Sequence, residues 1–212
     1  MKKHILCLGD SNTHGYCADP DDCADGGNRF NEDERWTCLL QKALGEEYLV
    51  TEEGLSGRTT VFQDPLHESM DALSVIYALL KSHETVDLLI VMLGTNDTKD
   101  RFGANAYCIS LGMERLLLKA MSVDCWGEHG PNILLVAPAP IGREMKDDGM
   151  GLYCAEKSEQ LAKYYEPLAE NLGCHFIDAA GCEVNSLDFT HLSRKGHSQL
   201  AALLASKVPE LL

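Results

Sequence analysis

A serine near the start of the chain and a histidine near its end are residues that could carry out nucleophilic catalysis, and each lies in a suitable sequence context. Ser11 lies in Gly9-Asp10-Ser11-Asn12, directly after the apolar run His4-Ile5-Leu6-Cys7-Leu8. His191 follows Asp188 by three residues, so a single turn can hold the carboxylate beside the imidazole. A serine hydroxyl attacks a carbonyl well only when a base takes its proton and a third group orients that base. Ser11, His191 and Asp188 meet this requirement if the fold brings the two ends together.

Three groups could stabilise the negative charge that such an attack places on the carbonyl oxygen. Donors for that oxygen must be in place before the reaction. We expect them to be the backbone N–H groups of Ser11 and Gly57 and the side-chain amide of Asn96. Glycine at position 57 permits an unusual φ and a close approach of the backbone. The sequence therefore predicts an oxyanion hole made of these three residues.

Each of these residues also has a simpler structural interpretation. Ser11 or its neighbour could only cap the helix that follows. His191 could be a surface histidine at the start of the last helix, and Asp188 a turn residue. Gly57 and Asn96 could be present only because the turns after their strands favour these residue types. A fold that gathers all five at one place would separate the two interpretations.

Other residues near these motifs receive supporting roles. We expect Asp97 to accept hydrogen bonds from the loop around it, and Arg58 and Lys99 to be surface or loop-bracing charges. His14 lies near Ser11 in the chain but is not expected to line a pocket. A further hypothesis is an acyl or alcohol pocket with apolar walls, for which the candidates are Trp36, Phe102, Ile141 and Met145.

The hydrophobic pattern predicts strands and helices in alternation. Strands are expected at 4–8, 46–53, 86–93, 132–137 and 175–178, and helices at 36–44, 67–81, 104–121, 155–172 and 194–207. Pro167 should kink or divide the fourth of these helices. This alternation predicts an α/β fold, a flavodoxin-like three-layer α/β/α sandwich with a central five-stranded parallel sheet in the order 2-1-3-4-5. Ser11, Gly57, Asn96 and the 188–191 pair would then lie at one edge of the sheet.

Composition limits the classes of partner. The 212 residues suit a single domain spanning 1–212, and a net charge of −15 disfavours nucleic acid and anionic membrane surfaces. We see neither a signal-peptide pattern nor an apolar run long enough to cross a membrane. The nine cysteines are scattered without a CxxC pair, which predicts no metal site and a reduced, cytoplasmic setting. The aspartates of loop 16–35 could suggest calcium, but a solvated loop over the site is the preferred interpretation.

Four short blocks together resemble the SGNH (GDSL-type) hydrolases. They are Gly9-Asp10-Ser11, Gly57, Gly94-Thr95-Asn96-Asp97 and Asp188-x-x-His191. Segments 5–11, 52–56 and 92–99 further resemble the arylesterase/acyltransferase branch of that family. Two positions depart from the pattern: the branch can carry alanine where Gly57 stands, and Asn12-Thr13-His14 replaces the leucine of GDSL. The backbone donor survives the first change and the catalytic residues survive both.

The resemblance implies a serine esterase that acts without a cofactor or a metal. Ser11 would attack an ester carbonyl while His191 takes its proton, and water would release the acid from the acyl-enzyme. We expect a small-molecule ester with a short acyl group such as acetyl, on a sugar or aryl alcohol, and acyl transfer wherever an alcohol arrives before water. Relatives in this branch form multimers, which suggests a homo-oligomer.

Two other classes of function compete with this hypothesis. The Ser11 turn at a helix start could hold a flavin or nucleotide phosphate, although the loop lacks a GxGxxG or Walker pattern. The same fold could also serve a non-catalytic carbohydrate-binding or assembly protein. An assembled Ser11, Asp188 and His191 would favour the esterase.

Overall fold

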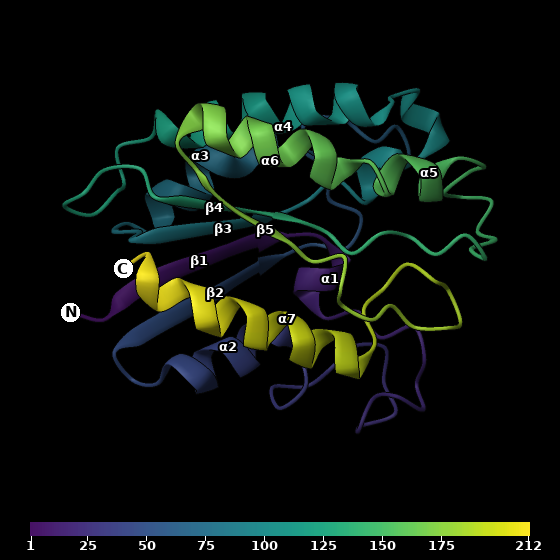
Figure 1. Ribbon diagram of the computed structural model, residues 1–212, viewed down its shortest axis with the longest axis horizontal. Coiled ribbons are helices and arrows are strands. Elements are labelled where there is room, and N and C mark those ends of the chain that lie inside the picture. Colours follow the sequence, from purple (N-terminus) through teal and green to yellow (C-terminus); the bar gives the residue numbers. More distant parts are fainter.

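The computed structural model describes residues 1–212 and places a five-stranded sheet at the centre of the molecule (Figure 1). The strands are β1 (Lys3–Gly9), β2 (Tyr48–Gly54), β3 (Leu88–Met92), β4 (Ile133–Ala137) and β5 (His175–Asp178). All neighbouring pairs are parallel, and the order is β2-β1-β3-β4-β5. The predicted doubly wound sheet and its strand order are therefore confirmed.

Helices cover both faces of this sheet (Figure 1). One face carries α3 (Ala72–Ser82), α4 (Ala106–Met121) and α6 (Leu161–Leu172), and the other carries α2 (Trp36–Leu44) and α7 (Arg194–Lys207). Short helices lie in the connections: α1 (Ser11–His14), α5 (Cys154–Ser158) and the 3₁₀ turns η1 (Asn96–Thr98), η2 (Asp100–Phe102) and η3 (Val208–Glu210). None of the helices combines the length and apolarity that crossing a lipid bilayer would require.

Alternate residues of the central strands feed two separate hydrophobic cores. In β1, Leu6 and Leu8 pack with α3, α4 and α6, whereas Ile5 and Cys7 pack with α2 and α7. β3 divides its side chains between the same two cores and is buried along its whole length. A strand covered on both faces needs apolar residues at every position, which explains the unbroken apolar runs in the sequence.

Helix boundaries differ from the prediction at two places. The helix expected at 67–81 begins only at Ala72, because the Asp71 side chain accepts a hydrogen bond from Ser74 N and caps it there. The helix expected at 155–172 is divided between α5 and α6 at residues 159–160. Pro167 lies within α6, so of the two predicted effects, a kink or a division, the division at this proline was wrong.

Parallel strands bring the segments after β1, β2 and β3 to one edge of the sheet. The two chain termini lie at the opposite edge (Figure 1). Any chemistry carried by the strand-end residues is therefore concentrated at the carboxyl edge.

A buried histidine couples α7 to α2 on the second face of the sheet. His197 is completely buried, and its Nδ1 accepts a hydrogen bond from the backbone N of Trp36 over 3.1 Å. Its Nε2 has no partner, and its ring packs edge-on against Phe30 at 4.8 Å between centroids. Burial lowers the pKa of His197 to about 3. The ring is thus neutral in the folded protein well below the pH at which an exposed histidine takes up a proton.

This difference predicts an acid-dependent loss of stability. Between pH 6.5 and pH 3 the unfolded chain binds a proton at position 197 that the folded chain does not, so the free energy of unfolding falls as pH falls. From pH 7 to pH 5, the wild type should lose about 2 kcal/mol more than the His197→Gln variant, which has no titrating group there. Urea unfolding of both proteins at the two pH values measures the difference, and equal losses would contradict it.

Candidate active site

The sharp turn after β1 presents Ser11 as the first residue of α1. Asp10 caps this helix, with its Oδ1 accepting a hydrogen bond from Asn12 N at 2.9 Å. Burial raises the pKa of the Asp10 carboxyl. A Cβ on Gly9 would lie 2.0 Å from Thr13 Oγ1, so the turn tolerates no larger residue there. The helix cap is therefore Asp10, and the hydroxyl of Ser11 is free of that role.

A continuous hydrogen-bonded chain links Ser11, His191 and Asp188. His191 Nε2 lies 2.8 Å from Ser11 Oγ, and His191 Nδ1 lies 2.5 Å from Asp188 Oδ2. Burial acts to raise the pKa of Asp188, but the hydrogen bond and charge of His191 outweigh it and hold that pKa well below its ordinary value. The carboxylate therefore stays ionised and can orient the imidazole. This arrangement can transfer a proton from the serine hydroxyl to the histidine.

The loop that carries Asp188 is fixed by its own polar groups. Asp188 Oδ1 accepts hydrogen bonds from the backbone N of Thr190 and of His191, and from Asn185 Nδ2 at 2.8 Å. Asn185 Oδ1 in turn accepts from Asp188 N. Phe189, which lies between Asp188 and Thr190, adopts a left-handed φ of 55°. Residues 188–191 thus form a hydrogen-bonded turn that fixes the orientation of the Asp188 and His191 side chains.

Three contacts that the sequence analysis missed hold the two ends of the chain together. Asn12 Oδ1 accepts a hydrogen bond from Leu192 N at 2.8 Å, directly beside both Ser11 and His191. The ring of Tyr16 packs on the ring of His191 at 4.5 Å between centroids. Asp22 in the acidic loop accepts from Arg194 N at 2.6 Å. The position of Asn12 next to the serine was the one signal in the sequence.

Two of the three expected oxyanion donors, Gly57 and Asn96, lie on turns that are hydrogen-bonded to each other. Gly57 has a φ of 91°, which favours glycine, and its N–H donates to no other atom of the protein. Asn96 Nδ2 donates to Arg58 O at 3.2 Å, and Asp97 Oδ1 accepts from Thr60 N at 2.9 Å. As the first residue of α1, Ser11 has a backbone N–H without a partner inside the helix. Three donors therefore remain available at this edge of the sheet.

Buried charges support these turns. Burial raises the pKa of Asp97 to about 6, while the hydroxyl and N–H of Thr60 act against that rise. Arg58 donates to the carbonyl oxygens of Gly9 and Glu53, which ties the turn after β2 to the end of β1. The expected roles of Asp97 and Arg58 in bracing the loops are confirmed.

A cavity of about 540 Å³ opens onto these groups. Its lining includes all five predicted site residues, so the structure brings them to one place. The remaining lining is mostly polar and was not predicted; it consists of Tyr16, Ser56, His67, Thr95, Lys99, Asp147, Met150 and Thr190. Lys99, expected at the surface or bracing a loop, is 9% exposed and lines this cavity.

The predicted apolar pocket is wrong, because its candidate residues are used elsewhere. Trp36 is buried in the core and donates its Nε1 hydrogen to Asn12 O at 3.1 Å. The ring of Phe102 packs against Phe62. Ile141 and Met145 belong to a small cluster of their own. None of these four candidates lines the cavity, and neither does His14, as expected.

The acidic loop does not gather its carboxylates around one point. Asp19 accepts from Asp21 N, Asp25 from Asn31 Nδ2 and Asp22 from Arg194 N. No group of three or more histidine, cysteine, aspartate or glutamate side chains anywhere in the chain has a metal-binding arrangement. Two of these contacts lie within the loop, and the third joins it to the start of α7.

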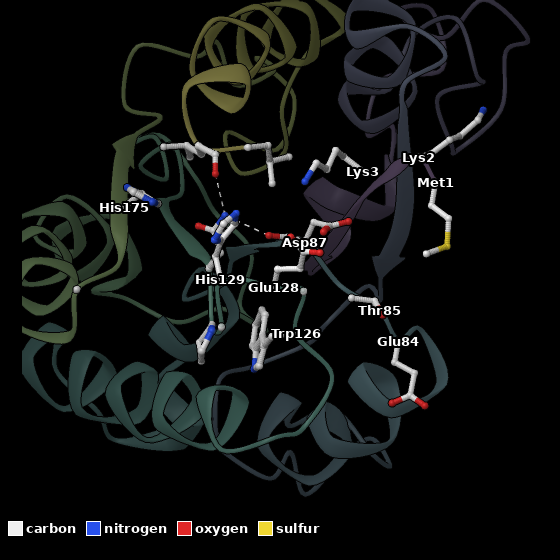
Figure 2. Close-up of a pocket in the computed structure, with 17 residues that line it drawn as sticks. Met1, Lys2, Lys3, Glu84, Thr85, Asp87, Trp126, Glu128, His129 and His175 are labelled. Carbon is white, nitrogen blue, oxygen red and sulfur yellow. Dashed lines mark hydrogen bonds between the residues drawn. The ribbon is translucent and has the colours of Figure 1, made fainter.

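A larger cavity, of about 1000 Å³, lies at the opposite edge of the sheet (Figure 2). Figure 2 shows Asp87 and Glu128 toward its middle, with Lys3 and His175 on either side. Asp87 Oδ2 accepts from His4 N, and Asn132 Nδ2 donates to Leu211 O, so polar groups here hold the two chain ends. Its lining contains no serine, and none of the predicted site residues reaches it.

Comparisons with known proteins find a matching family and similar structures. Residues 7–199 match the family model of the GDSL-like lipase/acylhydrolase family. A carbohydrate acetylesterase from Sinorhizobium meliloti is 33% identical with a TM-score of 0.89, and the match covers 100% of both chains. The aryl esterase of M. smegmatis is 34% identical with a TM-score of 0.88, over 99% of this chain and 100% of that chain. Comparison with curated proteins gives no match.

A more distant structure shows the fold alone. A member of the lipolytic G-D-S-L family from Veillonella parvula is 15% identical with a TM-score of 0.69, over 99% of this chain and 100% of that chain. The sheet and its covering helices are thus retained at low sequence identity.

The contact between Asn12 and Leu192 yields a prediction. Asn12→Ala keeps the residues Ser11, His191 and Asp188 themselves but removes the acceptor that holds their two loops together. Because a small misplacement of reacting groups is costly, labelling of Ser11 by a fluorophosphonate should slow at least about tenfold. Asn28→Ala, at an exposed position, is the matched control and should label at the wild-type rate. Equal labelling of all three proteins would show that the contact does not position the pair.

Proposed function

The chain belongs to the GDSL-like lipase/acylhydrolase family, and on that premise we propose that Ser11 is the nucleophile of an esterase for short-chain acyl esters. Family membership makes the protein a carboxylic ester hydrolase. His191 is the general base, and Asp188 orients it. The observation that carries the assignment is the unbroken contact from Ser11 Oγ through the imidazole to the Asp188 carboxylate.

The reaction proceeds through an acyl-enzyme. Ser11 Oγ attacks the ester carbonyl carbon while its proton moves to His191 Nε2. The tetrahedral intermediate collapses, the bond to the alcohol oxygen breaks, and the imidazolium returns its proton to the leaving alcohol. Water then attacks the acyl-Ser11 ester with His191 as base, which releases the acid and restores the hydroxyl. An alcohol in place of water gives acyl transfer.

Negative charge on the intermediate is met by three fixed donors. The N–H groups of Ser11 and Gly57 and the Nδ2 of Asn96 are proposed to bind the oxyanion. The hydrogen bonds of Asn96 to Arg58 O and of Thr60 to Asp97 keep these donors in position before the substrate arrives. Such preorganisation lowers the barrier because little rearrangement remains for the reaction itself.

The polar lining of the cavity favours a short acyl group on a polar alcohol. Serine, threonine, histidine, lysine and aspartate side chains surround the nucleophile, and only Tyr16 and Met150 are apolar or partly so. Hydroxyl groups of a sugar would find partners there, whereas a long alkyl chain would not. The carbohydrate acetylesterase among the similar structures supports an acetylated sugar as the substrate class, with aryl acetates as alternatives.

Two statements about the setting belong to the same proposal. All nine cysteines are free thiols, which fits the reducing cytoplasm, and the net charge of −15 disfavours nucleic acid as a partner. A homo-oligomer is proposed on the family resemblance alone, and light scattering of the purified protein tests it.

Removal of the nucleophile gives the first test of function. Ser11→Ala should lower kcat for p-nitrophenyl acetate by about 10³-fold or more, because the acyl-enzyme can no longer form. Ser198→Ala, an exposed serine on α7, is the control and should keep wild-type kinetics. Undiminished hydrolysis by the pure Ser11→Ala protein would rule out Ser11 as the nucleophile.

Chain-length dependence tests the proposed substrate class. An apolar acyl pocket would raise kcat/KM about fourfold for each added methylene, since each buried methylene contributes about 0.8 kcal/mol. With polar walls, kcat/KM should stay level or fall from p-nitrophenyl acetate to the octanoate, and xylose tetra-acetate should be hydrolysed. A steady rise with chain length would contradict the proposal.

A further inference from the structure

Lys99 is the one charged residue of the cavity wall that is largely buried and whose charged group has no hydrogen-bond or ion-pair partner. Lys99 is 9% exposed and lines the same cavity as Ser11 and His191. Its Nζ donates no hydrogen bond and has no carboxylate oxygen within ion-pair distance. Lys99 therefore has three N–H donors without a partner and lies at the wall of the cavity of about 540 Å³ that also contains Ser11.

Neighbouring cations are compensated by their own partners, in contrast to Lys99. Arg101 pairs with Asp64 at 3.3 Å, and Lys157 pairs with Asp100 at 2.9 Å. Both acceptors are thus occupied by another cation. Lys99 therefore has no carboxylate partner, although these neighbouring cations each have one.

The surroundings of Lys99 disfavour its positive charge. Burial lowers its pKa, and so does the nearby guanidinium of Arg101. Asp64, Asp10 and Asp97 act on it only from beyond ion-pair distance and in the opposite direction. A partly desolvated ammonium without a partner is less favourable than one that pairs with an anion. An incoming anion would recover that cost.

Other ionisable groups of the cavity do not supply the anion. Asp147 lines it but is exposed, and its Oδ1 accepts a hydrogen bond from Gly149 N at 2.7 Å. Asp188 is engaged by His191. His67 is a second basic side chain on the same lining. No carboxylate of the lining therefore pairs with Lys99, and a ligand could supply one.

We propose that Lys99 is a specificity-determining residue that binds a carboxylate on the alcohol part of the substrate ester. The inference rests on the proposed function and deepens it, because Ser11 and Lys99 share one cavity and must contact the same small molecule. A short acyl group has no room for a second charge, so the carboxylate belongs to the alcohol. The preferred substrates are then short-chain esters of hydroxy acids, acidic sugars included.

A local ammonium can attract this carboxylate despite the overall charge. The net charge of −15 repels anions at a distance, but solvent and salt screen exposed charges beyond about 10 Å. A contact inside the cavity is screened much less. Hydrogen bonds between an ammonium and a carboxylate are also stronger than those to a neutral acceptor.

The test compares two aryl acetates of the same shape, 4-acetoxybenzoate and 4-acetoxybenzamide. Lys99→Met should lower kcat/KM for the carboxylate by about tenfold to hundredfold, mainly through KM, and for the amide by less than about threefold. Lys99→Arg should keep most of the preference, since it retains the charge. Lys146→Met removes the same charge from an exposed loop nearby and should change neither ratio.

Two outcomes would overturn the proposal. Equal losses for both esters would mean that Lys99 supports the reaction or the fold rather than selecting an anion. No loss with either ester would mean that Lys99 does not contact the substrate. If Lys99→Met does not fold, the wild type alone decides, because the proposal requires it to bind 4-hydroxybenzoate about tenfold more tightly than 4-hydroxybenzamide.

Binding measurements separate this proposal from the assignment of the nucleophile. Calorimetry of 4-hydroxybenzoate and 4-hydroxybenzamide with the Ser11→Ala protein needs no turnover. Retained discrimination with undiminished hydrolysis by Ser11→Ala would leave Lys99 supported and the nucleophile wrong. Lost hydrolysis with equal binding of the two ligands would leave the nucleophile supported and Lys99 wrong.

Discussion

The 2.8 Å contact between Ser11 Oγ and His191 Nε2 joins residues 180 positions apart, and the rest of the molecule is arranged to maintain it. A hydrogen bond weakens steeply over a few tenths of an ångström, so both loops must be held with that accuracy. The parallel sheet brings them to the same edge but cannot set distances between loops. That task falls to Asn12, whose side chain accepts from Leu192 N, and to the closed turn around Asp188.

The acidic loop between α1 and α2 adds a second set of connections to the same contact. Tyr16 packs on the imidazole, while Asp22 and Glu34 hold Arg194 at the start of α7. Loops are ordinarily the most variable part of an α/β fold. Here the segment contacts both His191 and the start of α7, so it supports the site.

A feature could be predicted from the sequence when a local pattern of residues determines it, and could not when contacts between loops determine it. The strands were predictable because a sheet covered on both faces requires unbroken apolar runs. Their alternation with helices indicated a parallel sheet but not its order, for which 2-1-3-4-5 was chosen by analogy with flavodoxin-like folds and matches the structure. The meeting of Ser11 with His191 followed in turn, because strand ends of a parallel sheet share an edge. Side-chain contacts between loops, such as that of Tyr16, depend on loop conformations that no periodicity encodes. The pocket lining was misjudged for the same reason: Trp36 is apolar but is buried in the core, while Lys99 is charged and yet largely buried at the cavity.

The hydrogen bond from Asn96 to Arg58 O has a consequence for how that side chain meets a ligand. A carboxamide can rotate by half a turn and exchange its oxygen for its nitrogen, which would turn a donor into an acceptor. One of the two hydrogens on Asn96 Nδ2 already donates to the Arg58 carbonyl oxygen. A carbonyl oxygen can only accept, so it can bond to the nitrogen of the amide but not to its oxygen. The rotation would break that bond and is therefore disfavoured, and the second hydrogen keeps a constant direction. A neighbouring turn, rather than the substrate, thus decides which atom of the amide an incoming oxygen encounters.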